Sequence, residues 1–315
     1  MIPVRVASRS VAAHDVVRLE LETLDGSPLP PFTAGSHIDV ILANGLTRQY
    51  SLSSPPGHGD RYRIAVLREP ESRGGSQFVH DALLEGMTLS ISPPRNLFHL
   101  HEESRTYVLL AGGIGITPLL AMAYRLSALG KDFVLHYCAR APSRAAFLDE
   151  LKARPFAHVR LHFDDAPETQ LDLDQALCDP SPDRRLYVCG PNGFMDFVVQ
   201  GARARGWSPE HIHQEHFAGA AIPEGHDRAF ALVIASTGQT ITVGPDQTAA
   251  HALEAAGVFV PLSCEQGVCG TCLTGILAGQ PDHRDLFQTE AEKASNLMFT
   301  PCCSRARTPV LTLDL

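Results

Sequence analysis

Three cysteines lie close together in the last quarter of the chain, within the stretch CEQGVCGTCLTG. Cys264, Cys269 and Cys272 are spaced C-x4-C-x2-C, and 29 residues separate Cys272 from the adjacent pair Cys302 and Cys303. This spacing is typical of a plant-type [2Fe–2S] cluster, in which three thiolates come from one tight loop and a fourth comes from elsewhere. The small residues Gly267, Gly270 and Thr271 let such a loop wrap closely with its amides pointing at the cluster sulfurs.

Two alternatives follow from the same cysteines. A zinc site prefers paired C-x2-C motifs, and only one such pair is present here, so the spacing favours the iron–sulfur cluster over zinc. The fourth ligand is Cys302 or Cys303. Neighbouring side chains on a strand point to opposite faces, so only one of them can face the cluster, and spacing alone does not decide which.

Two short motifs in the first hundred residues have the chemistry to hold a flavin. Arg48-Gln49-Tyr50-Ser51-Leu52 offers an arginine for a phosphate and two hydroxyls for a flavin ring. Ser72-Arg73-Gly74-Gly75-Ser76 offers paired glycines, whose amides can approach a phosphate, together with further donors. The second motif is also compatible with a plain turn, but the two motifs in one small segment support each other.

Two glycine-containing turns in the middle of the chain predict a nicotinamide nucleotide site. Gly112-Gly113-Ile114-Gly115-Ile116-Thr117-Pro118 joins a strand to a helix and permits close approach of a pyrophosphate. Cys189-Gly190-Pro191-Asn192-Gly193-Phe194-Met195 ends a later strand and opens a helix, which places Cys189 near the reacting ring. Arg140 and Arg144 follow the second strand where an acidic residue would hold a ribose, so this stretch leaves NADH and NADPH both open.

The hydrophobic periodicity predicts three kinds of domain. Residues 1–103 show short alternating strands separated by Pro- and Gly-rich turns, which indicates a small antiparallel β-barrel. Residues 104–218 alternate strands with helices, including a helix expected at 143–154, which indicates a doubly wound parallel sheet. Residues 219–229 have the composition of a linker, and residues 230–315 combine strands with a short helix around the cysteine loop. His211, His213 and Glu215 are expected to be polar residues near a strand end.

Composition excludes several classes of function. The formal net charge is -9, so a general nucleic-acid-binding role is not expected, although an acidic surface can steer a basic protein partner. The first residues contain no run of signal-peptide type, and no stretch approaches the ~20 apolar residues of a membrane helix. We therefore expect no membrane association and a cytoplasmic location. Hydrolase and Walker motifs are absent from the sequence.

In this order, the motifs RQYSL, RGGS, GGIGITP, CGPNGFM and CEQGVCGTC with CCSRA resemble those of the phthalate dioxygenase reductase family, over essentially the whole chain. This family includes the reductases of Rieske oxygenases. The resemblance implies an FMN-binding barrel, an NAD domain and an α+β ferredoxin of the β-grasp type. It also favours Cys302 as the fourth ligand, because the family's C-x-S-R-A ending fits Cys302, Ser304, Arg305 and Ala306. The family generally prefers NADH.

The resemblance also implies roles for individual residues. Ser51 would lie near N5 of the flavin, Phe217 would cover its ring, and Cys189 would lie beside nicotinamide C4, so Ser51 and Cys189 are the expected catalytic residues. The full expected FMN set is Arg48, Tyr50, Ser51, Ala65, Val66, Arg73, Gly74, Gly75, Ser76, Thr117 and Phe217. The expected NAD set is Gly112, Gly113, Gly115, Pro118, Arg140, Cys189, Gly190, Pro191 and Met195. The expected cluster ligands are Cys264, Cys269, Cys272 and Cys302.

These features predict an NADH-dependent reductase that passes electrons through FMN and a [2Fe–2S] cluster to a terminal Rieske oxygenase. Such an oxygenase would act in aromatic ring hydroxylation or O-demethylation. Two alternatives are a reductase for a cytochrome P450 or a free ferredoxin, and a redox-sensing iron–sulfur protein without turnover.

Overall fold

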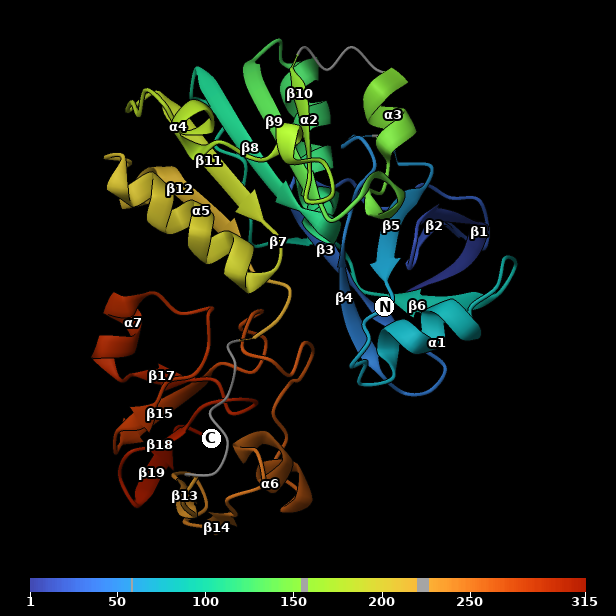
Figure 1. Cartoon of the computed structure of the whole chain (residues 1–315). Coiled ribbons are helices and arrows are strands. Elements are labelled where there is room, and N and C mark those ends of the chain that lie inside the picture. Colours follow the sequence, from blue (N-terminus) through green and yellow to red (C-terminus); the bar gives the residue numbers. More distant parts are fainter. Residues whose placement is uncertain (58, 154–157, 220–226) are drawn as a thin grey trace. The chain divides into compact units, whose positions relative to one another are not determined.

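The computed structural model describes residues 1–57, 59–153, 158–219 and 227–315 (Figure 1). The described chain divides into two compact units, Met1–Glu215 and His216–Leu315. The first unit holds an antiparallel sheet and a parallel sheet, and the second holds a smaller mixed sheet. None of the helices in the described part of the chain has both the length and the apolar character that a membrane crossing requires.

The N-terminal sheet is antiparallel, with the strand order β4-β3-β6-β1-β2-β5, and β7 pairs with β3. The two end strands, β4 and β5, also come into contact, so the sheet curves into a barrel (Figure 1). Alternating residues such as Val4, Val6, Leu19 and Leu21 fill its core, as the period-2 pattern requires. Its elements are β1 (Ile2–Ala13), β2 (Val16–Thr23), β3 (Ser36–Ile41), β4 (Thr47–Ser51), β5 (Tyr62–Leu67), α1 (Gly75–Asp81), β6 (Thr88–Ile91) and β7 (Arg95–Asn96).

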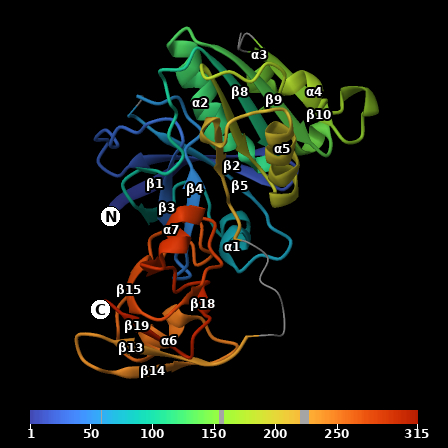
Figure 2. The same ribbon diagram turned by 90° about the vertical axis from the view of Figure 1, so that its left-hand side faces the viewer.

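The second sheet of this unit is parallel, with the order β10-β9-β8-β11-β12. Alternate residues of β8 face opposite cores: Leu109 packs with α2, whereas Val108 packs with α4 and α5. Helices α2 and α5 therefore cover opposite faces of the strands (Figure 2). The elements are β8 (Thr106–Gly112), α2 (Ile116–Ala128), β9 (Asp132–Ala139), α3 (Leu148–Ala153), β10 (Val159–Phe163), α4 (Leu173–Ala176), β11 (Arg184–Cys189), α5 (Asn192–Ala204) and β12 (Ile212–Glu215).

Strand order reverses between β8 and β11, because the chain runs outward from β8 to β10 and then returns to add β11 and β12 on the other side. Ligands of doubly wound sheets bind at the carboxyl ends of the strands at such a switch point. Gly112 ends β8 and Cys189 ends β11, so both predicted nucleotide turns lie at this position.

The second unit has the sheet order β14-β13-β19-β15-β17, with β13 and β19 parallel and the other pairs antiparallel. A separate ribbon pairs β16 with β18. This mixed sheet with α6 is the β-grasp arrangement expected for the ferredoxin part. The elements are β13 (Phe230–Ile234), β14 (Thr240–Val243), α6 (Ala249–Ala255), β15 (Thr274–Ala278), β16 (Pro281–Asp282), α7 (Glu290–Ser295), β17 (Met298–Phe299), β18 (Arg305–Ala306) and β19 (Val310–Leu313).

The multidomain fold class is confirmed, but one predicted helix is shorter than expected. The helix expected at 143–154 begins only at Leu148, because Pro142–Arg144 forms a 3-10 turn and Phe147 has a left-handed φ of 61°. The two compact units meet after Glu215, whereas the sequence analysis placed a boundary at residue 218. Most of the predicted linker at 219–229 lies outside the described residues.

Candidate functional site

Strand β4 carries the first flavin motif on its two faces. Tyr50 and Arg48 lie opposite Ile38 and Val40 of β3, whose side chains belong to the barrel core, while Ser51 lies on the other face. Burial raises the pKa of Tyr50 to about 12, so its hydroxyl keeps its proton and can donate a hydrogen bond. The motif therefore presents a phenol on one face and an alcohol on the other.

Arg48 brings the two predicted phosphate-binding motifs together. Its guanidinium Nη2 donates to the carbonyl of Arg73 at 3.1 Å, and its side chain lies across Gly75. A Cβ added to Gly75 would lie 2.5 Å from Nε of Arg48, so the glycine is what allows the arginine to lie here. Gly74, which precedes α1, has a left-handed φ of 86°. The Arg48 guanidinium thus lies at a glycine turn, an arrangement suited to a phosphate.

The serines of this turn hold its backbone. Ser72 Oγ accepts from the backbone N–H of Gly74 at 3.2 Å and from Ser76 Oγ at 3.0 Å. Ser76 Oγ in turn accepts from the N–H of Glu69 at 3.1 Å. A phosphate would have to share these hydroxyls with the turn.

Ala65 and Val66, predicted to line the flavin ring, are both buried in β5 but point to opposite sides. Val66 packs into the barrel core, and Ala65 packs into the core that contains α2. A flavin ring on one side of the strand can therefore contact only one of these two side chains.

Three residues from distant parts of the first unit meet at the strand ends. Ser51 Oγ donates to Oε2 of Glu215 at 3.5 Å, and Glu215 pairs in register with Cys189 across β11 and β12. Cys189 is fully buried. Its burial is the main cause, and the nearby Glu215 a smaller one, that raises the pKa of its thiol well above the ordinary value. Cys189 is therefore a neutral thiol at this site.

Glu215 is a site residue that the sequence analysis treated as an ordinary polar residue. Loss of water around the half-buried carboxyl raises its pKa to about 8, and the Ser51 hydroxyl offsets only part of that effect. Its position as the last residue of the last parallel strand was the available signal, since ligand sites lie at that edge. A strongly shifted carboxyl at such an edge is a candidate functional group.

The two nucleotide turns are packed directly against each other. A Cβ on Gly115 would lie 2.6 Å from the backbone N of Gly190 and closer still to the carbonyl of Cys189. Gly112 and Gly190 both face the ring of Phe194, which would collide with a Cβ at either position. These glycines are therefore required for backbone approach at the switch point, as the sequence predicted.

Thr117, which was predicted to contact FMN, and the remaining predicted nucleotide residues fall into two groups. Thr117 and Pro118 are buried in the first turn of α2, and Thr117 Oγ1 donates to the carbonyl of Ile114 at 3.0 Å. Pro191 precedes α5 at the surface, whereas Met195 is fully buried among the core residues beneath α5. Met195 is therefore a core residue, one helical turn after Pro191.

Arg140 is exposed directly after β9, where a nucleotide ribose would be recognised. Arg144 instead pairs with Asp15 of the barrel, with 3.4 Å between Nη1 and Oδ2. Arg140 is consequently the better placed of the two for the nucleotide. Phe217 is partly exposed and belongs to the second unit, so its role at the flavin stays a prediction.

In the second unit, all five cysteines of the predicted cluster region are buried. A hydrogen bond with the Cys264 thiol is the largest effect on Cys269 and lowers its pKa to about 5. A hydrogen bond with the Cys302 thiol is likewise the largest effect on Cys272 and lowers its pKa. Cys269 therefore contacts the thiol of Cys264, and Cys302 contacts the thiols of both Cys272 and Cys303. Among the described residues, no three His, Cys, Asp or Glu side chains converge as one metal ion requires.

This donor set fits a two-iron cluster better than zinc. Each iron of a [2Fe–2S] cluster takes two protein thiolates, whereas structural zinc takes four ligands around one point. The loop also has amide donors directed at sulfur: the N–H of Gln266 approaches Cys264 Sγ at 3.4 Å, and that of Thr271 approaches Cys269 Sγ at 3.5 Å. Such donors stabilise negatively charged sulfur.

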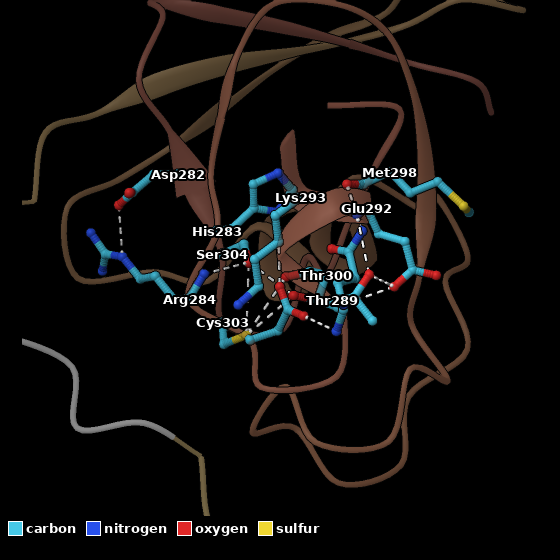
Figure 3. Close-up of polar contacts among 12 residues, drawn as sticks. Asp282, His283, Arg284, Thr289, Glu292, Lys293, Met298, Thr300, Cys303 and Ser304 are labelled. Carbon is cyan, nitrogen blue, oxygen red and sulfur yellow. Dashed lines mark hydrogen bonds and ion pairs between the residues drawn. The ribbon is translucent and has the colours of Figure 1, made fainter. Parts of the chain in front are cut away.

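Cys302 and Cys303 differ in their surroundings. Cys302 contacts the thiols of Cys272 and Cys303, while Cys303 Sγ also lies 3.3 Å from Thr300 Oγ1 and 3.9 Å from Ser304 Oγ (Figure 3). This favours Cys302 as the fourth ligand, in agreement with the expectation drawn from the family ending.

Comparison with known proteins gives a consistent result. Residues 232–307 match the family model described as a 2Fe-2S iron-sulfur cluster binding domain. The chain is 51% identical over 317 residues to a vanillate O-demethylase oxidoreductase of Pseudomonas sp. (strain HR199 / DSM 7063), covering 100% of both chains.

Two solved structures are also similar over the whole chain. Phthalate dioxygenase reductase, titled a modular structure for electron transfer from pyridine nucleotides to [2Fe-2S], has a TM-score of 0.79 and 35% identity, with 100% of this chain and 98% of that one covered. An intact type IV self-sufficient cytochrome P450 monooxygenase has a TM-score of 0.85 and 37% identity. This chain covers only 41% of that longer protein.

Proposed function

This chain belongs to the family that contains phthalate dioxygenase reductase and the vanillate O-demethylase oxidoreductases, and on that premise we propose that it passes electrons from NADH to an oxygenase. The route runs through FMN and a [2Fe–2S] cluster. The observation that carries the proposal is the gathering of the four predicted ligand thiols, all buried and in contact with other thiols, in the second unit.

We assign the work to four segments of the chain. The FMN barrel comprises residues 1–103, the NAD domain 104–218, the linker 219–229 and the ferredoxin domain 230–315. The flavin accepts two electrons as a hydride and the cluster carries one at a time, so together they supply the change from paired to single electrons. The residues of this chain bind these groups, orient them and control water and protons around them.

At the barrel, Arg48 and Arg73 attract the FMN phosphate to the turn at Gly74 and Gly75. Tyr50 keeps its phenolic proton and lies against the ring. The hydroxyl of Ser51 donates its one proton to Glu215 here, so it would have to turn that proton toward the ring edge near N5 when FMN is bound. Glu215 is neutral at pH 7, because its pKa of about 8 favours the protonated carboxyl, so it can hold or release a proton beside this hydroxyl.

At the switch point, Gly115 packs directly against the backbone of Cys189 and Gly190, so both turns lie together at the edge where the nucleotide would bind. Cys189 contributes a small, neutral and water-excluding wall for nicotinamide, since it is buried and protonated. Arg140 is the exposed cation at the adenosine end. NADH is the proposed electron donor on the basis of the family. Because Arg140 could also accept a 2′-phosphate, the activity with NADPH should be measured beside that with NADH.

At the cluster, Cys264, Cys269, Cys272 and Cys302 would supply the four thiolates that hold the two irons. The amides of Gln266 and Thr271 donate to the ligand sulfurs and favour their deprotonated form. Because the ferredoxin segment after residue 229 has few basic residues, we expect its acceptor to present a basic surface.

The proposed acceptor is the Rieske centre of a separate terminal oxygenase in an aromatic hydroxylation or O-demethylation system. The likeness to a self-sufficient P450 favours one second candidate, a reductase that serves a P450 haem or a free ferredoxin. Both candidates share the same internal chemistry and differ only in the acceptor.

Five measurements on the purified protein test the proposal. We expect released FMN by HPLC, two irons with two acid-labile sulfides per chain, and bleaching of the visible spectrum by NADH. Steady ferricyanide reduction by NADH would exclude a sensor without turnover. NADH-driven turnover with the oxygenase of a vanillate O-demethylase system, but not with a P450, would support the Rieske acceptor. Zinc in place of iron would overturn the proposal.

A further inference from the structure

The chain between β16 and α7 lies, in sequence, between the loop that carries Cys264, Cys269 and Cys272 and the turn that carries Cys302. Residues 283–288, which we call the brace, follow the ribbon strand at Asp282 and precede the α7 cap at Thr289. Neither the sequence motifs nor the family match assigns these residues a role. The inference below rests on the proposed [2Fe–2S] cluster at the four cysteines.

The first contact of the brace is with the loop that carries three of the thiols. The N–H of Leu286 donates to the carbonyl of Gly267 at 2.9 Å. Gly267 has a left-handed φ of 74°, and a Cβ there would lie 2.9 Å from Cα of Asp285 and closer to Sγ of Cys303. The loop, the brace and the turn at Cys303 are therefore in direct van der Waals contact at this glycine.

The second contact covers the other glycine of the loop. Gly270, between Cys269 and Cys272, has a φ of 67°, and its α-carbon faces the ring of Phe287. A Cβ at Gly270 would lie 2.5 Å from Cε1 and 2.7 Å from Cε2 of that ring. Phe287 is 37% exposed, so one face of the ring covers the loop and the other reaches solvent.

The third contact is with the turn that carries the fourth thiol. The N–H of Arg284 donates to Ser304 Oγ at 3.1 Å, and Ser304 Oγ lies 2.9 Å from Thr300 Oγ1 (Figure 3). Asp282 also pairs with Arg305 in the β16–β18 ribbon. The brace thus ties the fourth-ligand turn to the three-thiol loop.

The brace is itself held in shape from within. The carboxylate of Asp285 is buried, and its Oδ2 accepts from the N–H of Gln288 at 2.7 Å. This bond closes a turn around Leu286 and Phe287, so the aromatic ring is presented at a fixed position. A mobile loop would not give the ring a defined place on Gly270.

We propose that Phe287 is a positioning residue for the cluster, which closes the Gly270 side of the ligand loop against water and thereby sets the reduction potential and the lifetime of the cluster. Cluster potentials depend on solvent exposure and on the groups that surround the ligand sulfurs. Reduction adds negative charge to an already anionic centre, and water stabilises the more highly charged form. Removing the ring should therefore make the cluster easier to reduce and faster to lose.

The test compares Phe287→Ala with Phe259→Ala in the full-length, cluster-loaded protein. Phe259 is 84% exposed and lies five residues before Cys264, so it matches Phe287 in type and region but is far less enclosed. For F287A we expect the reduced-to-oxidised ratio at a fixed potential to rise about tenfold. Loss of visible absorbance in the presence of a chelator should accelerate by about the same factor. F259A should match the wild type in both measurements.

A second variant separates positioning from general packing. Phe287→Leu keeps an apolar side chain over Gly270. Its cluster should have nearly the wild-type reduction potential and lifetime, even if its melting temperature is as low as that of F287A. A wild-type potential in F287A, or equal shifts in F287A and F259A, would overturn the role of Phe287 while leaving the electron-transfer function intact. A purified protein without iron and sulfide would instead remove the proposed function, and this inference with it.

Discussion

The hydroxyl of Ser51 donates a hydrogen bond of 3.5 Å to Oε2 of Glu215, a residue 164 positions later in the chain. Ser51 ends β4 of the barrel and Glu215 ends β12 of the parallel sheet. The bond therefore joins the predicted flavin-binding strand to the edge where the nucleotide turns lie. Cys189, which pairs with Glu215 in register, brings the second predicted catalytic residue to the same place.

The carboxyl of Glu215 gives the folded protein a specific pH dependence. Its pKa rises from 4.5 to about 8, so between these values the native state keeps a proton that the unfolded state has lost. Stability therefore falls as pH rises through this window, by up to about 5 kcal/mol, since each pH unit between the two pKa values contributes about 1.4 kcal/mol. Glu215→Gln cannot ionise and should lack this part of the slope.

We expect the melting temperature of E215Q, relative to that of the wild type, to increase from pH 5 to pH 8. Differential scanning fluorimetry measures both. Ser51→Ala serves as the control, because it removes the hydrogen bond and leaves the carboxyl able to titrate. Parallel pH profiles for E215Q and the wild type would show that Glu215 ionises normally in the folded protein.

The two adjacent cysteines should respond differently to the same substitution. Cys302 faces Cys272, whereas Cys303 lies against Thr300 and Ser304. Cys302→Ser should lose most of its iron, labile sulfide and visible cluster absorbance. Cys303→Ser should keep them, because serine can occupy the same polar contacts. Retention of a normal cluster in C302S with loss in C303S would reverse the ligand assignment.

A methyl group at Gly115 should disrupt the nucleotide site. Gly115 has an ordinary helical φ of -61°, so the effect of Gly115→Ala would come only from the close backbone of Cys189 and Gly190. We expect a loss of about 1–3 kcal/mol in stability and a raised KM for NADH. Gly193→Ala, where a Cβ would meet nothing within 4 Å, should be neutral or slightly stabilising. Equal NADH kinetics in both variants would contradict this account.

Arg48 should contribute directly to flavin affinity. It connects the two phosphate-binding motifs through the carbonyl of Arg73, so Arg48→Ala removes a charged donor from the proposed phosphate site. We expect the Kd for FMN, measured by flavin fluorescence, to rise about 10- to 100-fold. Arg68→Ala provides the matched control, since Arg68 is an exposed barrel arginine paired with Asp81. An unchanged Kd in R48A would place the phosphate elsewhere.

Local spacing in the sequence determined the cysteine ligand set up to one ambiguity, the glycine turns at both nucleotide-binding positions, and the order of barrel, parallel sheet and ferredoxin. These features depend on residues near one another in the chain or on periodicity within single elements. The helix expected from residue 143 was wrong at its start, because the left-handed φ of Phe147 breaks a segment whose composition is helical.

Tertiary structure alone decided three other points: which of Cys302 and Cys303 faces a partner thiol, that Glu215 meets Ser51, and that Phe287 covers Gly270. Each is a contact between residues that the chain brings together only after the strands have paired. Burial, which shifts the pKa of Glu215, likewise arises from neighbours remote in sequence. A motif shows the groups that can do the chemistry, but the fold determines which of them are near each other and shielded from water.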